Sequence, residues 1–205
     1  MKAKLILKDG TTYEGESFGA QTSTAGEVVF ATGMTGYPES LTDPSYKGQI
    51  VTFTYPLIGN YGVPDPFLWE ENHIMVSGLI VSNYIDTPSH FQSTKTLAQW
   101  FKDENLPLIE IKDTRAITQK IRSFGTILGK IIIEKDLDFY DPNLHNLVDQ
   151  VSTKKIYTFP STLKEEHHTF PSPLRRGQGE VQGNSKTIVL IDCGAKRNIA
   201  KSLNR

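Results

Sequence analysis

The sequence is poor in cysteine, in net charge and in long apolar runs, and each shortage excludes a class of protein. Its 205 residues include one cysteine, Cys193, which excludes an internal disulfide framework and a multi-cysteine zinc site. Lys and Arg number 22 against 23 Asp and Glu, a balance that argues against a dedicated nucleic-acid-binding protein. Apolar runs such as 131–133 are far shorter than the roughly 20 residues that span a bilayer. We therefore expect neither nucleic acid nor membrane as a partner. The N-terminus lacks a signal-peptide pattern, which favours a cytoplasmic location.

Residues 1–151 carry the patterns of a mixed α/β domain. The Asp9-Gly10 pair between two extended runs predicts a hairpin in which both residues take positive φ. Further strands are expected at 27–32, 49–55, 74–85 (with a bulge or bend at Gly78), 108–111 and 126–134. Apolar spacing predicts helices around 97–101, 117–124 and 144–151. Ser93 or Thr94 is the expected cap of the first helix, and Asp113 and Gly125 bound the second.

The character of the chain changes after Val151. Residues 152–185 contain scattered Pro, Gly and charged residues without a hydrophobic period, which predicts a flexible linker. Residues 186–192 form a continuous apolar run typical of a strand buried in a parallel sheet, and a helical pattern begins at 198–203. One strand and part of a helix cannot form a sheet alone, so we expect the sequence to be the front part of a longer protein.

The segment 33–47 is rich in turn-forming residues, and we expect an ordered loop because Pro38 and Pro44 interrupt any regular structure. Such a loop can display Ser45 and Tyr46 to a ligand. The alternative, which the residues alone favour, is a structural turn in which Ser45 caps local backbone amides.

Several stretches of the sequence resemble one family, the small, glutamine-handling subunit of carbamoyl phosphate synthetase. They are FATGMTGYPE at 30–39, TDPSY at 42–46 and QIVTFTYPLIGNYG at 49–62, with similar segments at 111–118 and 191–199. These motifs are long, and the resemblance extends over the whole chain, most weakly in the linker.

The resemblance implies a β-rich α/β domain of the three-layer, swivelling type over residues 1–151. It also implies that 186–205 are the first strand and helix start of a flavodoxin-like class I glutamine amidotransferase domain. In this family a cysteine in a Gly-x-Cys-x-Gly elbow, with a His and a Glu, hydrolyses glutamine. Ammonia then passes to the large subunit, a ligase that uses ATP, Mg and bicarbonate to make carbamoyl phosphate for pyrimidine and arginine biosynthesis.

The same resemblance assigns one site residue here, Ser45, whose hydroxyl would contact L-glutamine, and one partner, the large subunit. The elbow is absent from this sequence, so we expect no catalytic residue, metal or cofactor in this chain. Cys193 is expected to be a small buried core residue. The alternatives are an independent thiol enzyme that uses Cys193, and a stand-alone non-catalytic module that binds a synthetase partner. A downstream reading frame containing the elbow would distinguish the fragment from the module.

Overall fold

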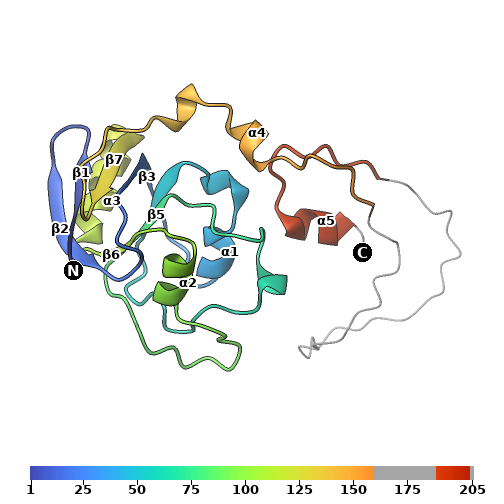
Figure 1. Ribbon diagram of the computed structural model, residues 1–205, viewed down its shortest axis with the longest axis horizontal. Helices are drawn as coiled ribbons and strands as arrows, with labels where there is room; N and C mark the ends of the chain where they lie inside the picture. The colour runs from blue at the N-terminus through green and yellow to red at the C-terminus, as the bar shows by residue number, and fades with distance from the viewer. Residues whose placement is uncertain (159–187, 204–205) are drawn as a thin grey trace, which may run out of the picture.

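The computed structural model describes residues 1–158 and 188–203, and their strands close into a barrel (Figure 1). The strands are β1 (Lys2–Leu7), β2 (Thr12–Ser17), β3 (Thr24–Ala31), β4 (Gln49–Phe53), β5 (Gly78–Val81), β6 (Leu108–Glu110) and β7 (Ile127–Ile132). The helices are α1 (Tyr37–Leu41), α2 (Leu97–Asp103), α3 (Thr114–Phe124), α4 (Leu147–Val151) and α5 (Arg197–Leu203). Short 3₁₀ turns are η1 (Pro44–Tyr46), η2 (Pro66–Leu68) and η3 (Pro142–Leu144).

The strand order around the barrel is β1-β2-β6-β5-β4-β3-β7, and β7 pairs back onto β1. Strands β3, β4, β5 and β6 are parallel neighbours, whereas β1, β2 and β7 pair antiparallel. Parallel neighbours need long crossover connections. The crossover from β3 to β4 contains α1 and η1, and it carries the segment that includes Ser45.

The two faces of the parallel strands bury two separate hydrophobic cores. In β4, Ile50 joins the core that contains Ile117 of α3, while Val51 and Phe53 join the core that contains Trp100 of α2. This alternation is the period-2 pattern expected of a strand covered on both sides. The α/β class predicted from the sequence is confirmed. A closed barrel does not establish the three-layer, swivelling-type arrangement, which stays a prediction.

The first hairpin is confirmed, with Ile6 opposite Thr12, but its predicted turn geometry is wrong. Only Gly10 has a positive φ, 88°, in this hairpin. Asp9 keeps a negative φ, and its carboxylate accepts a hydrogen bond from the Thr11 amide at 3.0 Å. The connection spans four residues, so the two-residue turn that needs two positive φ values is not required.

Two predicted strand or loop regions differ from the structure. The strand expected at 74–85 is shortened to β5, and Gly78 begins the strand instead of interrupting it. Residues 74–76 are buried without being a strand, and the Met75 amide donates to the Leu41 carbonyl at 2.8 Å. In segment 33–47, Pro38 and Pro44 do not prevent regular structure. They occupy the first turns of α1 and η1, where a missing N–H removes no internal hydrogen bond.

The helix boundaries are confirmed in part. Asp113 caps α3 by accepting from the Ala116 amide at 2.9 Å, and Gly125 ends the helix with φ of 83°. The cap of α2 is Thr96, not Ser93 or Thr94. The helix expected at 144–151 is shortened to α4, because its apolar residues find little to pack against, and Leu144 is 81% exposed.

The apolar run at 188–192 is not a strand, which contradicts the prediction for 186–192. Ile188, Val189 and Ile191 are exposed, and no strand in the described ranges pairs with them. A strand is stable only when its backbone groups find a ladder partner. The helix expected at 198–203 is confirmed as α5. Most of the predicted linker, 159–185, lies outside the described residues, so the predicted domain boundaries stay predictions. Among the described helices, none combines the length and apolarity needed to cross a bilayer.

Candidate functional site: the Ser45 turn

Helix α1, which precedes the Ser45 turn, is held at its start by a tyrosine from a later crossover. The cap residue Gly36 has no side chain to accept from the first helical amides. The hydroxyl of Tyr61 takes this role and accepts from the Gly36 and Tyr37 amides at 2.8 and 2.9 Å. Tyr37 in turn donates its hydroxyl to the Gly62 carbonyl at 2.6 Å, and the two rings stack at 4.1 Å. Burial raises the pKa of both phenols, so both stay neutral.

The end of α1 is anchored by Thr42, a fully buried polar residue. Its hydroxyl donates to the Pro38 carbonyl at 2.9 Å and accepts from the Glu70 amide at 2.9 Å. Both hydrogen-bonding capacities of the hydroxyl are therefore used, as expected for a buried polar group. This residue joins the crossover between β3 and β4 to the segment that follows η2.

Asp43 shapes the turn that presents Ser45. Its side chain accepts from the Ser45 amide at 3.0 Å, which caps the 3₁₀ turn η1. The expectation that the Ser45 side chain would cap local amides is wrong, since the aspartate two residues earlier does so. Ser45 is exposed while Asp43 and Pro44 are buried. Its hydroxyl has no hydrogen-bond partner among the described residues, so it is available to an incoming ligand.

The segment 192–196 lies against this turn, although more than 140 positions separate the two in the sequence. The Lys196 ammonium contacts the second Asp43 oxygen at 2.6 Å. Gly194 has φ of 98°, and a Cβ there would lie 2.6 Å from a Val151 methyl carbon and 3.5 Å from the Pro44 Cβ. Only a residue without a side chain fits both the backbone conformation and this close packing.

Asp192 holds the start of this segment in place. One oxygen accepts from the Gly194 and Ala195 amides at 2.8 Å each, and the other accepts from the Thr153 amide at 2.7 Å. Partial burial opposes ionisation of this carboxyl, but the three amide donors together hold its pKa below the ordinary value. The aspartate therefore joins the chain on both sides of the undescribed residues.

Helix α5 packs on the crossover between β4 and β5, next to η2 in Figure 1. The Glu70 carboxylate accepts from the Asn198 amide at 2.9 Å, and Arg197 donates to the Asn72 side chain at 2.6 Å. Lys201 donates to the Phe67 carbonyl at 3.0 Å. The segment after Asp192 is thus fixed by several polar contacts with the barrel domain.

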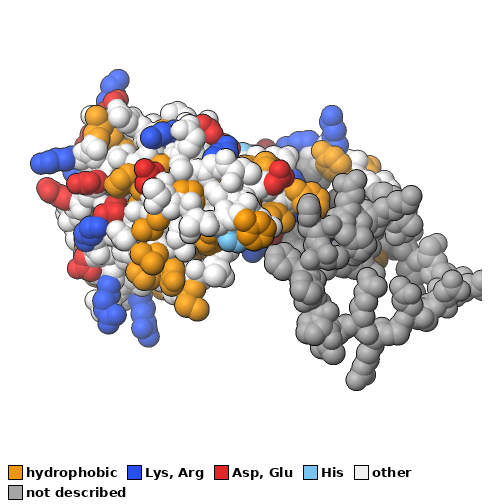
Figure 2. All heavy atoms as spheres, turned by 90° about the horizontal axis from the view of Figure 1, so that it is seen from below, with side chains coloured by type: hydrophobic (Ala, Val, Ile, Leu, Met, Phe, Trp, Pro, Cys, Tyr) orange, Lys and Arg blue, Asp and Glu red, His pale blue; other side chains and the backbone are white. Residues whose placement is uncertain are grey.

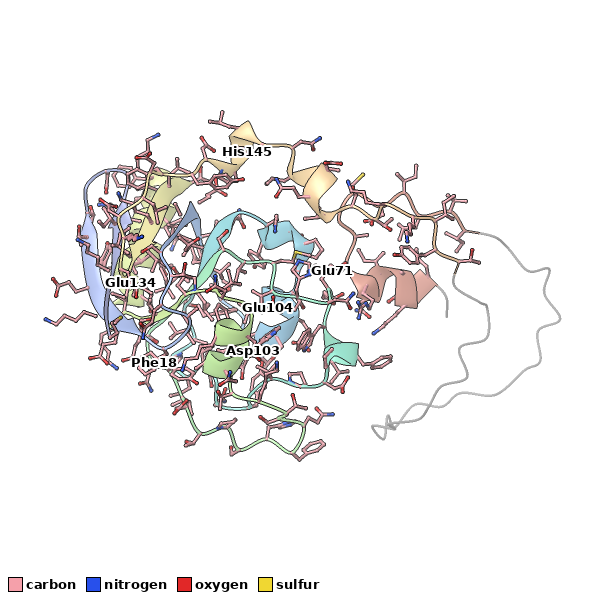
Figure 3. The ribbon with its side chains drawn as sticks, in the orientation of Figure 1. Phe18, Glu71, Asp103, Glu104, Glu134 and His145 are labelled. Atoms are coloured by element: carbon pink, nitrogen blue, oxygen red, sulfur yellow. The ribbon has the colours of Figure 1, made fainter. Side chains whose placement is uncertain are left out.

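Cys193 is exposed, which contradicts the expectation of a buried core thiol. The apolar run that precedes it forms no strand here and packs into no core, so the thiol is left at the surface. In the described part of the chain it has no histidine partner. His145 follows η3 on the outside of the barrel, where its ring stacks on Tyr140 at 4.7 Å (Figure 3). Nothing among the described residues therefore activates this thiol as a nucleophile.

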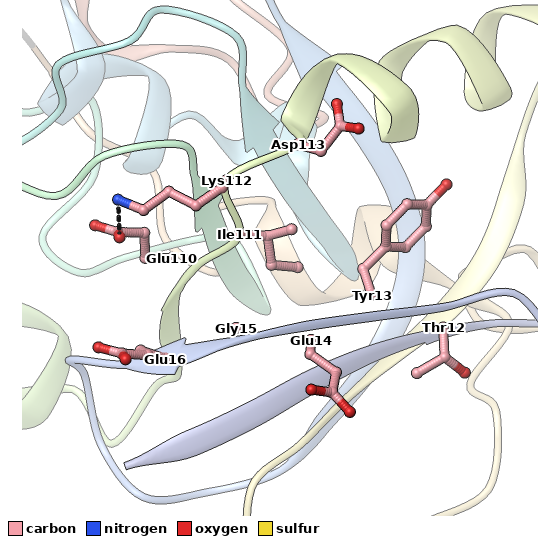
Figure 4. Close-up of a pocket in the computed structure, with 9 residues that line it drawn as sticks. All are labelled: Thr12, Tyr13, Glu14, Gly15, Glu16, Glu110, Ile111, Lys112 and Asp113. Carbon is pink, nitrogen blue, oxygen red and sulfur yellow. Dashed lines mark ion pairs between the residues drawn. The ribbon is translucent and has the colours of Figure 1, made fainter.

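A surface groove between β2 and the segment after β6 shares no residue with the Ser45 turn (Figure 4). It forms because β2 and β6 pair only at Glu16–Glu110 and Ser17–Ile109 and then diverge. Its lining is acidic, and Lys112 forms an ion pair with Glu110. The described residues contain no group of three His, Cys, Asp or Glu side chains placed to hold a metal ion.

Sequence reasoning singled out Ser45 but not the residues that hold it. Asp43, Tyr61 and Lys196 all lie within the motif stretches, yet no local pattern pairs them, since their contacts join separate parts of the chain. The chemical signal was the Asp-Pro-Ser order, in which an aspartate two positions before a serine is placed to accept from its amide.

Comparisons with known proteins agree with the motifs. The family model described as "Carbamoyl-phosphate synthase small chain, CPSase domain" matches residues 5–131. A carbamoyl phosphate synthase small chain of Bacillus thuringiensis is 42% identical over 207 residues, which are 100% of this chain and 52% of that protein. The mitochondrial carbamoyl-phosphate synthase [ammonia] of Mus musculus is 43% identical over 98% of this chain and 13% of its own length.

A third relative, the multifunctional protein pyr1-3 of Dictyostelium discoideum, is 44% identical over 98% of this chain and 9% of its own length. Among solved structures, an aminopeptidase from Aneurinibacillus sp. strain AM-1 has a TM-score of 0.37 at 13% identity, over 64% of this chain and 30% of that chain, which is too low to support an argument. The chain thus spans about half of the bacterial relative and a much smaller share of the other two. From the family model and the bacterial relative, the chain belongs to the carbamoyl-phosphate synthase small-chain family.

Proposed function

We propose that this chain is the front part of a carbamoyl phosphate synthase small subunit, which docks on the large subunit and contributes Ser45 to a glutamine pocket. The complete complex would hydrolyse glutamine and pass ammonia to the large subunit. There ATP, Mg and bicarbonate would be used in the ligase reaction. The family membership supports the coarse assignment, and the geometry of the turn supports the role of Ser45.

The observation that carries the pocket assignment is the contrast within one turn. Thr42, Asp43 and Pro44 are buried and fixed, whereas the Ser45 hydroxyl points out without a partner in the described chain. A hydroxyl can donate to a carboxylate and accept from an ammonium group. Both groups belong to the backbone part of a free amino acid such as L-glutamine, so Ser45 is suited to bind that part of the substrate.

Docking on a large subunit is supported by the exposed apolar side chains of the barrel domain. Figure 2 shows hydrophobic side chains at the surface of this domain. Phe91 is 83% exposed, Phe67 70% and Met34 69%. Large exposed aromatic side chains are typical anchors of protein interfaces.

The test is Ser45→Ala in the complete small subunit, assembled with its large subunit. We expect the KM for glutamine to rise about 5- to 20-fold, as for loss of a hydrogen bond to a charged group. Synthesis from added ammonia should not change, because ammonia bypasses the glutamine pocket. Unchanged glutamine kinetics would remove Ser45 from the pocket. Failure of the 205-residue chain to co-purify with the large subunit would argue against the docking role.

A further inference from the structure

The Asp43 carboxylate has two oxygens with two different tasks. One oxygen accepts from the Ser45 amide at 3.0 Å and so fixes the turn. The other contacts the Lys196 ammonium at 2.6 Å. The Asp43 side chain is only 6% exposed, whereas that of Lys196 is 45% exposed. A nearly buried carboxylate needs charged or hydrogen-bonding partners, and here the lysine supplies the positive one.

We propose that Lys196 is a positioning residue for Ser45, acting through Asp43. The ammonium keeps the Asp43 carboxylate ionised and oriented, the carboxylate holds the Ser45 amide, and the amide fixes where the Ser45 hydroxyl points. The part of this inference that concerns glutamine rests on the function proposed above. The positioning itself concerns only residues of this chain.

The lysine is placed by its surroundings and not by chance side-chain geometry. Gly194 packs between Val151 and Pro44, and Asp192 binds the two amides that follow Cys193. Two residues after Lys196, the Asn198 amide is bound by Glu70. The backbone is therefore fixed before and after the lysine, and its side chain is delivered to Asp43 with little loss of freedom on forming the contact.

The chemistry of the ion pair favours a permanent contact. The hydrogen bond from Lys196 to Asp43, opposed only by partial burial, raises the pKa of the lysine above its ordinary value. The ammonium is thus charged throughout the physiological range. A short charge-assisted hydrogen bond to a carboxylate with little water around it is among the stronger polar contacts in proteins.

A purely structural tie between the two segments is the competing explanation. It predicts a loss of stability that is not concentrated in the turn. Positioning predicts a local effect on the turn and a specific effect on glutamine binding. Lys196→Met removes the charge while keeping most of the side-chain length, and Lys196→Arg restores a charge. The matched control is Lys95→Met, which removes another partly exposed lysine whose ion pair with Asp103 at 2.9 Å lies at the end of α2 (Figure 3).

The first measurement is amide hydrogen exchange of the segment 43–47 in the 205-residue chain. We expect Lys196→Met to speed exchange of the Ser45 amide about tenfold, as for loss of one supporting charged partner. Lys196→Arg should restore protection, and Lys95→Met should leave it unchanged. If Lys196→Met folds but leaves protection of the turn as in the unmodified chain, the proposal is wrong. If Lys196→Met does not fold, Asp43→Asn gives the same test from the other side of the pair.

The second measurement is glutamine-dependent synthesis by the complete complex. Lys196→Met should raise the KM for glutamine about 5- to 20-fold with little change in kcat or in ammonia-dependent synthesis. If the lysine acts through Asp43, Lys196→Met should add little to the effect of Asp43→Asn. Fully additive effects would overturn the proposal. An unchanged KM in Ser45→Ala would instead remove the proposed glutamine contact, and hydrogen exchange would still decide the positioning role.

Discussion

Replacing Tyr61 by Phe tests the claim that one hydroxyl organises the crossover that carries Ser45. The substitution keeps the ring and its stacking on Tyr37 at 4.1 Å, and it removes the acceptor of two backbone amides. Tyr37 is 2% exposed, so its amide cannot turn to water, whereas Gly36 is partly exposed and its amide can. An unsatisfied buried donor costs about 1–3 kcal/mol, and a partly solvated one costs less. We therefore expect a loss of about 2 kcal/mol in the free energy of unfolding.

The assay is urea unfolding followed by tryptophan fluorescence. Trp69 and Trp100 are buried and lie 4.5 Å apart in the core beside this crossover, so they report on its loss. With an m value of about 2 kcal/mol/M, the midpoint should fall by about 1 M urea. The control is Tyr13→Phe, because the Tyr13 hydroxyl has no hydrogen-bond partner in the described chain. A loss below about 0.5 kcal/mol for Tyr61→Phe, or an equal loss in the control, would refute the reasoning.

Two further predictions concern acid stability and chemistry. Hydrogen bonds from Lys120 and from the Thr11 amide lower the pKa of Asp9 from 3.8 to about 2. Its contribution to stability is therefore present above pH 4 and is lost as the pH falls toward 2. The difference in Tm between the unmodified chain and Asp9→Asn should accordingly shrink over that range, and a constant difference would contradict the assignment. The purified 205-residue chain should release no ammonia from glutamine, and alkylation of the exposed Cys193 should not alter its folding or docking. Enzyme-like ammonia release that alkylation abolishes would instead favour the thiol-enzyme alternative.

Local rules were sufficient where the physics is local. The caps of α3, the Gly10 turn and the two-faced pattern of β4 depend on residues within one element, and the sequence predicted each element. Errors arose where an apolar run was taken for a strand or a helix. Residues 74–76 are buried by the neighbouring crossover, and Leu144 is exposed because no partner surface covers it.

The residues of 188–192 illustrate the same limit from the opposite side. Their apolar character predicts burial in a sheet, but hydrogen bonds in a sheet belong to pairs of strands, and the described chain provides no partner. Cys193 follows this run and is exposed for the same reason.

The amino-acid order by itself determined the α/β class, most of the strands and helices, and the choice of Ser45 as a candidate binding residue. It determined them because periodicity, capping and motif identity are encoded in neighbouring residues. Closure of the barrel, the clamp by Tyr61 and the contact of Lys196 with Asp43 were decided only by the tertiary structure. These contacts join residues that are 24 to 153 positions apart, and no local energy term specifies which distant side chain will fill a given position.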